Sequence, residues 1–168
     1  MRNYEWPFPI TMNRLHKVLS EHPAFSNPVV TETGATFSAT KERHAGRVTV
    51  LAKANGITAT LPAATGSGET YEFIVGTTIT SSNAIIKVAN SSDTMVGQLE
   101  TATTTGATTN GFCEAAGGTD DTITMNGTTT GGIAGSRVLC RDVKVNVWHV
   151  NGFLVGSGTL ATSLSATV

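Results

Sequence analysis

The feature that most constrains this chain is a series of short segments, from residue 35 onward, in which apolar and polar residues alternate. Residues 47–52 read Arg-Val-Thr-Val-Leu-Ala and residues 57–61 read Ile-Thr-Ala-Thr-Leu, with Asn55 and Gly56 between them. Alternation with a period of two places one side of a strand in a core, and Asn-Gly is a strong hairpin signal. Further segments of this kind follow at 71–75, 84–88, 94–99, 122–125, 137–143, 145–150 and 152–155. The series predicts an all-β domain, either a β-sandwich of jelly-roll type or a small β-barrel.

The composition also favours strands over helices. About one residue in six is Thr, well above ordinary usage, and 18 residues are Gly. Thr is β-branched and suits a pleated surface, whereas Gly supplies tight turns. Only 14% of the residues are charged and 39% are hydrophobic, so small neutral residues dominate. A length of 168 residues fits one domain with an appended segment.

The appended segment is the N-terminal region, where the composition differs. Four of the five prolines precede residue 30, and residues 4–10 read Tyr-Glu-Trp-Pro-Phe-Pro-Ile. Proline lacks the ladder donor of a central strand, so this stretch is predicted to be an extended arm. Residues 12–21 place apolar side chains on one face of a short helix that begins after Thr11 and ends before Pro23. We therefore divide the chain into an arm, residues 1–34, and a β domain, residues 35–168.

Large apolar side chains on this arm are the candidate binding residues. Aromatic anchors on a proline-stiffened segment lose little entropy on docking, and such anchors dominate protein–protein interfaces. The alternative is that the arm folds back and covers its own sandwich. The predicted partner-binding residues are Tyr4, Trp6, Phe8, Ile10, Leu15, Leu19 and Phe25.

Three stretches of small neutral residues interrupt the strand pattern. Residues 101–111 and 127–135 consist almost entirely of Thr, Gly, Ala and Asn, which predicts long loops or polar edge strands. The tail, residues 156–168, has a similar composition. We expect the tail either to add an edge strand or to run across a neighbouring chain.

The sequence offers little catalytic or metal-binding chemistry. Cys113 and Cys140 are the only cysteines, and sparse usage favours reduced, buried thiols over a disulfide. Asp120 and Asp121 form an acidic doublet that is interpreted as a solvated turn, with Ca²⁺ binding as the alternative. In the Trp-His pair at 148–149, Trp148 is expected to face the core and the histidine to face outward. No catalytic residue, metal ligand or cofactor is predicted.

Charge and hydropathy argue against two classes of partner. The formal net charge is −1, and the few aromatic residues are not interleaved with basic ones, so no nucleic-acid partner is expected. No apolar run approaches the ~20 residues of a membrane span, and the first residues lack the apolar region of a signal peptide. We expect a protein made in a cytoplasm, with no membrane partner.

Part of the chain resembles a group of small β-rich virion proteins of tailed bacteriophages. The resemblance covers roughly residues 45–168 and begins with a strand that ends in Leu-Pro-Ala-Ala-Thr-Gly at 61–66 and leads into Tyr-Glu-Phe-Ile-Val-Gly-Thr at 71–77. The remaining landmarks are at 85–90, 93–97, 121–132, 147–148 and 155–159. This group is associated with head decoration. Its motifs are strand and turn patterns without an active site, so they specify a fold better than a function.

The resemblance implies a capsid decoration, or cement, protein that is not an enzyme. Such a protein would bind the outer surface of the major capsid protein lattice, as a homotrimer at three-fold and quasi-three-fold sites, and would stabilise the virion head. The alternative is a tail or baseplate fibre or receptor-binding module, which would bind a cell surface. A small β-sandwich hydrolase is a further alternative, which converging ionisable side chains would favour.

Overall fold

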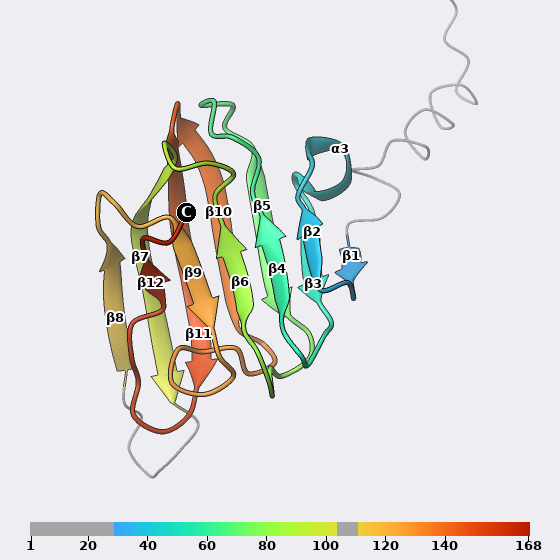
Figure 1. Ribbon diagram of the computed structural model, residues 1–168, viewed down its shortest axis with the longest axis vertical. Helices are drawn as coiled ribbons and strands as arrows, with labels where there is room; N and C mark the ends of the chain where they lie inside the picture. The colour runs from blue at the N-terminus through green and yellow to red at the C-terminus, as the bar shows by residue number, and fades with distance from the viewer. Residues whose placement is uncertain (1–28, 104–110) are drawn as a thin grey trace, which may run out of the picture.

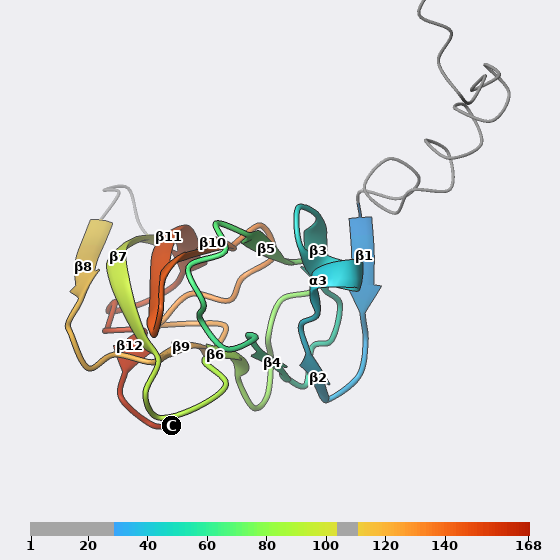
Figure 2. The same ribbon diagram turned by 90° about the horizontal axis from the view of Figure 1, so that it is seen from above.

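The structure is a computed structural model that describes residues 29–103 and 111–168. It consists of two β-sheets packed face to face, which appear as two layers when the molecule is seen from above (Figures 1 and 2). The seven-stranded sheet has the order β1-β3-β5-β10-β11-β7-β8 and the five-stranded sheet the order β12-β9-β6-β4-β2. The prediction of an all-β domain with two packed sheets is confirmed.

The elements of the seven-stranded sheet are β1 (Val29–Glu32), β3 (Val48–Leu51), β5 (Thr70–Val75), β7 (Thr94–Thr103), β8 (Gly111–Ala116), β10 (Arg137–Lys144) and β11 (Val147–Gly156). Those of the five-stranded sheet are β2 (Thr36–Ser38), β4 (Ile57–Thr60), β6 (Ala84–Lys87), β9 (Thr122–Met125) and β12 (Leu164–Ser165). A single helical turn, α3 (Lys41–His44), follows β2.

The first six strands wind alternately between the two sheets. Strands β1, β3 and β5 pair in parallel in one layer, while β2, β4 and β6 pair in parallel in the other. With β11 and β7, this makes five parallel pairings among the ten of the described residues. A jelly roll is built from antiparallel strands, so the connections differ from that expectation although the sandwich remains. Antiparallel pairing appears in the second half, as in the β10–β11 hairpin.

The turn predicted at Asn55 and Gly56 is present, but it does not close a hairpin, because β3 and β4 belong to different sheets. The turn carries the chain from one layer to the other. Gly56 has a φ of 82°, and a Cβ at this position would lie 2.6 Å from the carbonyl oxygen of Asn83. The turn chemistry was therefore recognised correctly, but the two strands that it joins stack across the core and do not pair.

The core lies between the sheets and contains the inward side of every alternating segment. Its largest side chains are those of Trp148, Tyr71 and Phe73, each about 1% exposed. The Trp148 and Tyr71 rings meet edge to face, with centroids 5.6 Å apart. Trp148 faces the core and His149 is exposed, as predicted. The pattern thus assigned the sides of strand β11 correctly, and β11 also joins the two segments predicted at 145–150 and 152–155.

Two predicted boundaries shift at the ends of the chain. Residues 29–32 were assigned to the arm, but they form β1 and pair with β3, so they belong to the β domain. The predicted helix at 12–21 lies outside the described residues. The tail adds the edge strand β12 to β9, which confirms one of its two expected roles.

The two cysteines lie apart and are free thiols. Cys140 is fully buried on β10, and burial raises the pKa of its thiol to about 12. Cys113 is exposed on β8, so the prediction that both thiols are buried is wrong for this residue. Strands β11 and β7 separate β10 from β8. Three strand spacings amount to about 14 Å, whereas a disulfide needs Cα atoms within about 7 Å.

Candidate functional site

All of the partner-binding residues predicted from the sequence lie outside the described residues. These are Tyr4, Trp6, Phe8, Ile10, Leu15, Leu19 and Phe25. The β domain nevertheless contains three features that bear on function. They are a set of buried carboxylates, a pocket at one end of the sandwich, and the outward face of the seven-stranded sheet.

The buried carboxylates share one role. Asp93, Glu114, Asp121 and Asp142 are each less than a tenth exposed. Each accepts backbone N–H bonds from an irregular segment distant in sequence. Irregular backbone has no ladder partner, and an unpaired buried N–H is costly. These acids therefore fix loops in place.

Asp142 makes the densest set of these contacts, with the loop at 65–67. Its carboxylate accepts the backbone N–H groups of Thr65 (3.0 Å), Gly66 (2.6 Å) and Ser67 (2.9 Å), and also the hydroxyls of Thr65 and Ser67. Desolvation raises the pKa of this carboxyl, but the hydrogen bonds from Ser67, Thr65 and Gly66 outweigh it and hold the pKa at about 2. Asp142 is thus ionised throughout the physiological range and is poorly suited to general acid–base catalysis.

The loop held by Asp142 forms one wall of a pocket at the end of the sandwich. The pocket has a volume of about 430 Å³. Its lining includes the almost fully buried side chains of Tyr71 and Trp148, and Ala39, Pro62 and Ala63 supply an apolar wall. The Tyr71 hydroxyl donates to Glu69 at 3.2 Å, and Lys41 pairs with the same carboxylate. Burial, followed by the charge of Glu69, raises the pKa of Tyr71, so its phenol stays protonated.

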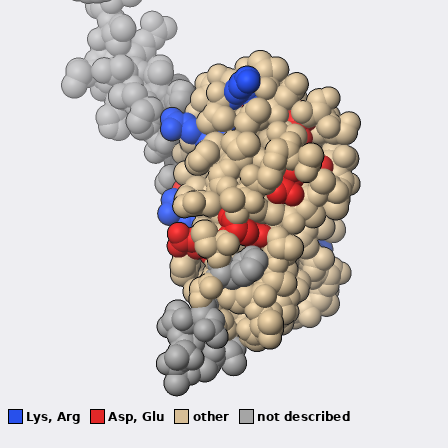
Figure 3. Space-filling view, turned by 90° about the vertical axis from the view of Figure 1, so that its left-hand side faces the viewer, with Lys and Arg blue, Asp and Glu red and all other residues tan. Residues whose placement is uncertain are grey.

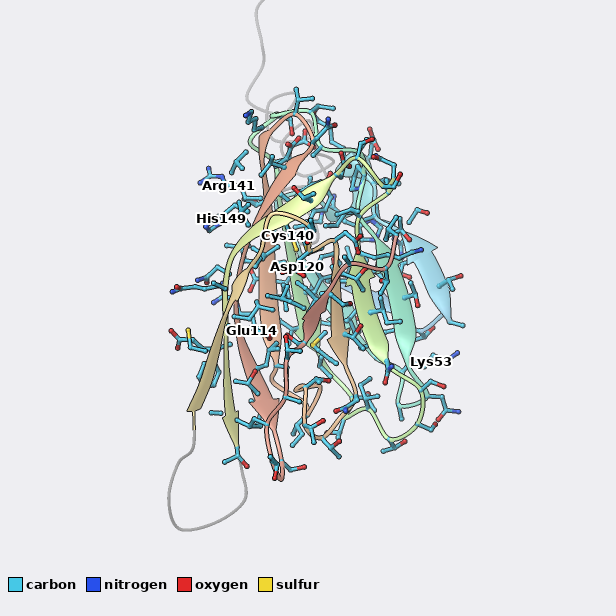
Figure 4. All side chains as sticks on the ribbon, turned by 60° about the vertical axis from the view of Figure 1, so that its left-hand side comes forward. Lys53, Glu114, Asp120, Cys140, Arg141 and His149 are labelled. Carbon is cyan, nitrogen blue, oxygen red and sulfur yellow. The ribbon has the colours of Figure 1, made fainter. Side chains whose placement is uncertain are left out.

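The C-terminal tail is held by two further carboxylates. Glu114 accepts the N–H groups of Ser163 and Leu164 and the hydroxyls of Thr162 and Ser163. Asp121 accepts the N–H groups of Thr167 at 2.8 Å and Val168 at 3.1 Å. Glu114 lies on β8, from which it faces the tail (Figure 4).

The acidic doublet is therefore not a solvated turn at Asp121. That residue is 6% exposed, and its carboxylate bonds the tail. Desolvation raises the pKa of Asp121, but hydrogen bonds from Thr167, Thr122 and Val168 lower it overall. The Asp120 carboxylate accepts the N–H of Gly117, in a partly exposed turn. The two carboxylates do not converge on one ligand.

A second ionisable pair lies near α3. His44 is 2% exposed, and its Nε2 lies 3.3 Å from Glu32 Oε1. The backbone N–H of Thr40 donates to Nδ1 at 3.0 Å, so Nδ1 must be the unprotonated nitrogen. Nε2 then carries the proton and donates a hydrogen bond to the Glu32 carboxylate. Because both ring nitrogens are used, this pair links α3 to β1 and has no free base.

On the outward face of the seven-stranded sheet, the strand register places side chains in rows across neighbouring strands. One row crosses five neighbouring strands as Val50, Ile74, Arg137, Phe153 and Glu100. Phe153 is 51% exposed, although large aromatic side chains are usually buried. A hollow of about 240 Å³ lies beside it, lined by Glu100, Arg137, Asn151 and Gly152. Arg137 also pairs with Glu72 at 2.6 Å on the same face.

The side of the molecule at β8 is mostly uncharged. A space-filling view from this side shows a few acidic side chains across the middle and basic ones toward one end (Figure 3). Within residues 29–103 and 111–168, no group of three or more His, Cys, Asp or Glu side chains is placed to hold a metal ion. The same residues include no helix with the length and apolar character needed to cross a membrane.

The four buried carboxylates were not predicted from the sequence, although the position of one of them in its strand indicates burial. In β10 the inward positions are Val138, Cys140 and Asp142, so an acid continues the core-facing alternation. A charged group on that side requires buried partners. Comparison with known proteins adds nothing to this picture, because no protein-family description, curated protein or solved structure matches the chain.

Proposed function

We propose that this chain is a capsid decoration protein that acts by binding and not by catalysis. The observation that carries the proposal is the outward face of the seven-stranded sheet, where an exposed Phe153 stands beside a shallow hollow. The ionisable groups best placed for chemistry, in contrast, are committed to structure. Asp142, Asp121 and Glu114 hold backbone segments, and His44 uses both ring nitrogens.

The outward face has the composition of a protein-binding surface. Aromatic and Arg side chains form most interface hot spots, and here Phe153 lies opposite Arg137 in the strand register. Glu100 on the other side of Phe153 supplies a partner for a basic group. Such a face suits a protein surface better than a small molecule, because the exposed strands of a wide sheet surround the hollow.

The N-terminal arm supplies the second part of the proposed contact. It leads directly into β1, the edge strand of the same sheet. Its aromatic residues would bind the capsid lattice together with Phe153. As a homotrimer at three-fold and quasi-three-fold sites of the virion surface, the protein would engage several capsid subunits at once, and multivalency would make modest single contacts persistent.

The test is co-sedimentation of the purified protein with undecorated capsids, followed by a count of bound copies. We expect saturation at three bound copies for every three-fold and quasi-three-fold site. Phe153→Ser and Trp6→Ala should each weaken binding about tenfold or more, as expected for a hot-spot loss of about 1.4 kcal/mol or greater. His149→Ala, an exposed change on the same face, is the matched control and should bind normally.

Two results would contradict the proposal. Absence of co-sedimentation at any concentration would eliminate the capsid as partner and would direct attention to a tail or baseplate location. Normal capsid binding by both Phe153→Ser and Trp6→Ala would leave the capsid as the partner but would exclude the outward face and the arm as the contact surface. Thermal melting of each variant distinguishes a lost contact from a lost fold.

A further inference from the structure

Strand β8 is the longest edge strand in the part of the chain that the structure describes. The edge strands β1, β8, β2 and β12 contain four, six, three and two residues. On one side β8 pairs with β7, whereas its other side borders no strand, and both ribbon views place it at the rim of the molecule (Figures 1 and 2). The backbone N–H and C=O groups on the open side of such a strand form a template for pairing with another chain.

The sequence of β8 lacks the features that prevent edge strands from pairing. Natural edge strands carry Lys or Pro, contain a bulge, or are very short. Residues 111–116 read Gly-Phe-Cys-Glu-Ala-Ala, and their register with β7 continues without a bulge. The edge of the other sheet at β2 is shorter and runs into α3, and β1 directly follows Pro28. Strand β8 is therefore the edge most open to pairing.

The charges on β8 allow two copies of this strand to approach each other. Cys113 and Ala115 are exposed on the outward face, where Cys113 continues the row of Phe153 and Glu100. Glu114, the only charged residue of β8, is buried on the opposite side, and its carboxylate accepts hydrogen bonds from the tail. Identical edges carry identical charges, so like charges at the edge would oppose self-pairing. The exposed side chains of β8 are neutral and raise no such barrier.

We propose that β8 is a docking site for β8 of a second copy of this chain, paired antiparallel about a two-fold axis. Such a contact is isologous, because the same strand contributes both sides. It would join the two seven-stranded sheets into one continuous sheet and place their outward faces side by side. The proposed capsid contact does not use this edge, so the inference does not rest on the proposed function.

Strand geometry leaves few registers for this pairing. In an antiparallel pair, residues that exchange hydrogen bonds face one another and alternate with residues that do not. A strand that pairs with its own copy must therefore have one residue directly opposite itself. Near the middle of β8 this residue is either Cys113 or Glu114. Two Glu114 carboxylates directly opposite each other would repel, so we infer that Cys113 faces Cys113.

This register brings the two Cys113 thiols within reach of a disulfide. Directly opposite residues in an antiparallel pair have Cα atoms about 4.5–5.5 Å apart, within the range of about 4.4–6.8 Å found in disulfides. The two copies of Ala115 would instead be offset by about 14 Å along the strands, which is too far for a disulfide. Each Ala115 would face Gly111 of the other copy.

The experiment is oxidation of the reduced protein with oxidised glutathione, followed by a non-reducing denaturing gel. Each cross-link oxidises two Cys113 thiols to one disulfide and reduces one glutathione disulfide to two thiols. Cys140 is fully buried, so the exposed Cys113 is the reporter. Wild-type protein should form a covalent dimer. The double variant Cys113→Ser with Ala115→Cys also carries its thiol at an exposed position of β8, and it should cross-link at least about tenfold more slowly because its thiols are not held together.

A mixture of two variants tests the register directly. One carries Cys113→Ser with Ala115→Cys, and the other carries Cys113→Ser with Gly111→Cys. A Cβ at Gly111 meets nothing within 4 Å, so the second substitution fits the strand. The mixture should cross-link at a rate similar to that of the wild type, whereas each variant alone should react slowly. A mixture that reacts no faster than its separate components would overturn the inference.

Molar mass measured by light scattering under reducing conditions gives a readout without a disulfide. Cys113→Lys places two cations opposite each other and should lower the mass about twofold. His149→Lys adds an exposed cation on β11, away from the edge, and should leave the mass unchanged. A Cys113→Lys variant with the wild-type mass would contradict the pairing. A wild-type thiol that cross-links no faster than the Ala115→Cys thiol, but becomes protected from alkylation on capsids, would also overturn it and would assign the edge to a strand of the capsid.

Discussion

The loop at 64–67 and the tail at 162–168 are both irregular segments, and both are held by two buried carboxylates. Asp93 and Asp142 bond the loop, whereas Glu114 and Asp121 bond the tail. The loop, however, is continuous with β4 on one side and β5 on the other. The tail has a strand connection only through the short β12, which pairs with β9 over two residues.

Because the loop is anchored by strands at both ends and the tail is not, the carboxylate hydrogen bonds have a different role in each segment. In the loop, carboxylates determine conformation, because the strands on either side keep the segment near its place in any case. In the tail, carboxylates determine attachment, because two residues of strand pairing provide little stability alone. Loss of a loop carboxylate should therefore disturb the end pocket and the fold, whereas loss of a tail carboxylate should release one edge of the sandwich.

The largest expected effect is that of Asp142→Ala. The substitution removes a buried carboxylate and leaves three backbone N–H groups and two hydroxyls of the loop at 65–67 without their acceptor. We expect a loss of about 3 kcal/mol in the free energy of unfolding, measured by urea denaturation. Glu72→Ala removes an acid from an exposed ion pair on the outward face and should cost less than about 1 kcal/mol. Equal losses would refute a special role for Asp142.

Glu114→Ala should have the next largest effect, about 2 kcal/mol, because the two N–H groups of Ser163 and Leu164 lose their acceptor. The change should be local. Amide hydrogen exchange should accelerate at 162–168 while the amides at 65–67 keep their protection. If exchange increases equally in both segments, the tail is not an independent unit and the comparison between the two regions fails.

The sequence predicted the strands better than their partners. Alternation identified the sides of β4 and β11, since a period of two depends only on which side meets the core. It was wrong for β3, where Thr49 is fully buried and Val48 and Val50 face outward. It says nothing about which strand lies alongside. A turn such as the one at Gly56 can join paired strands or strands in different layers, and the pairing of β3 and β4 in different sheets shows which case applies.

The carboxylates were harder to predict for the same reason. Asp142 could be suspected because it continues an inward-facing series in β10. Glu114 and Asp121 acquire their role from the tail, which reaches them from nearly fifty residues away along the chain. No local pattern contains that information, so the doublet at 120–121 was interpreted as a turn. The sides of Trp148 and His149, in contrast, followed from the alternation of β11.

Acid should weaken the loop before it weakens the strands. The hydrogen bonds to Asp142 hold its pKa at about 2, below its ordinary value of 3.8. A depressed folded-state pKa contributes stability that is present above pH 4 and is lost as the pH falls toward 2. The contribution is about 2 kcal/mol. The stability difference between the wild-type chain and Asp142→Asn, measured by urea denaturation at several pH values, should therefore shrink by about that amount from pH 5 to pH 2. A constant difference would show that ionisation of Asp142 does not stabilise the loop.

The smallest effect should come from Asp121→Asn, and its neighbour provides a matched control. The new amide keeps one acceptor but places a donor where Thr167 or Val168 also donates, so we expect a loss of about 1 kcal/mol. Asp120→Asn changes one hydrogen bond in a partly exposed turn and should cost less than about 0.5 kcal/mol. Amide exchange at 167 and 168 should accelerate only in Asp121→Asn. If both variants release the tail equally, the tail is held by the net charge of Asp120 and Asp121. The hydrogen bonds of the Asp121 carboxylate would then have no special role.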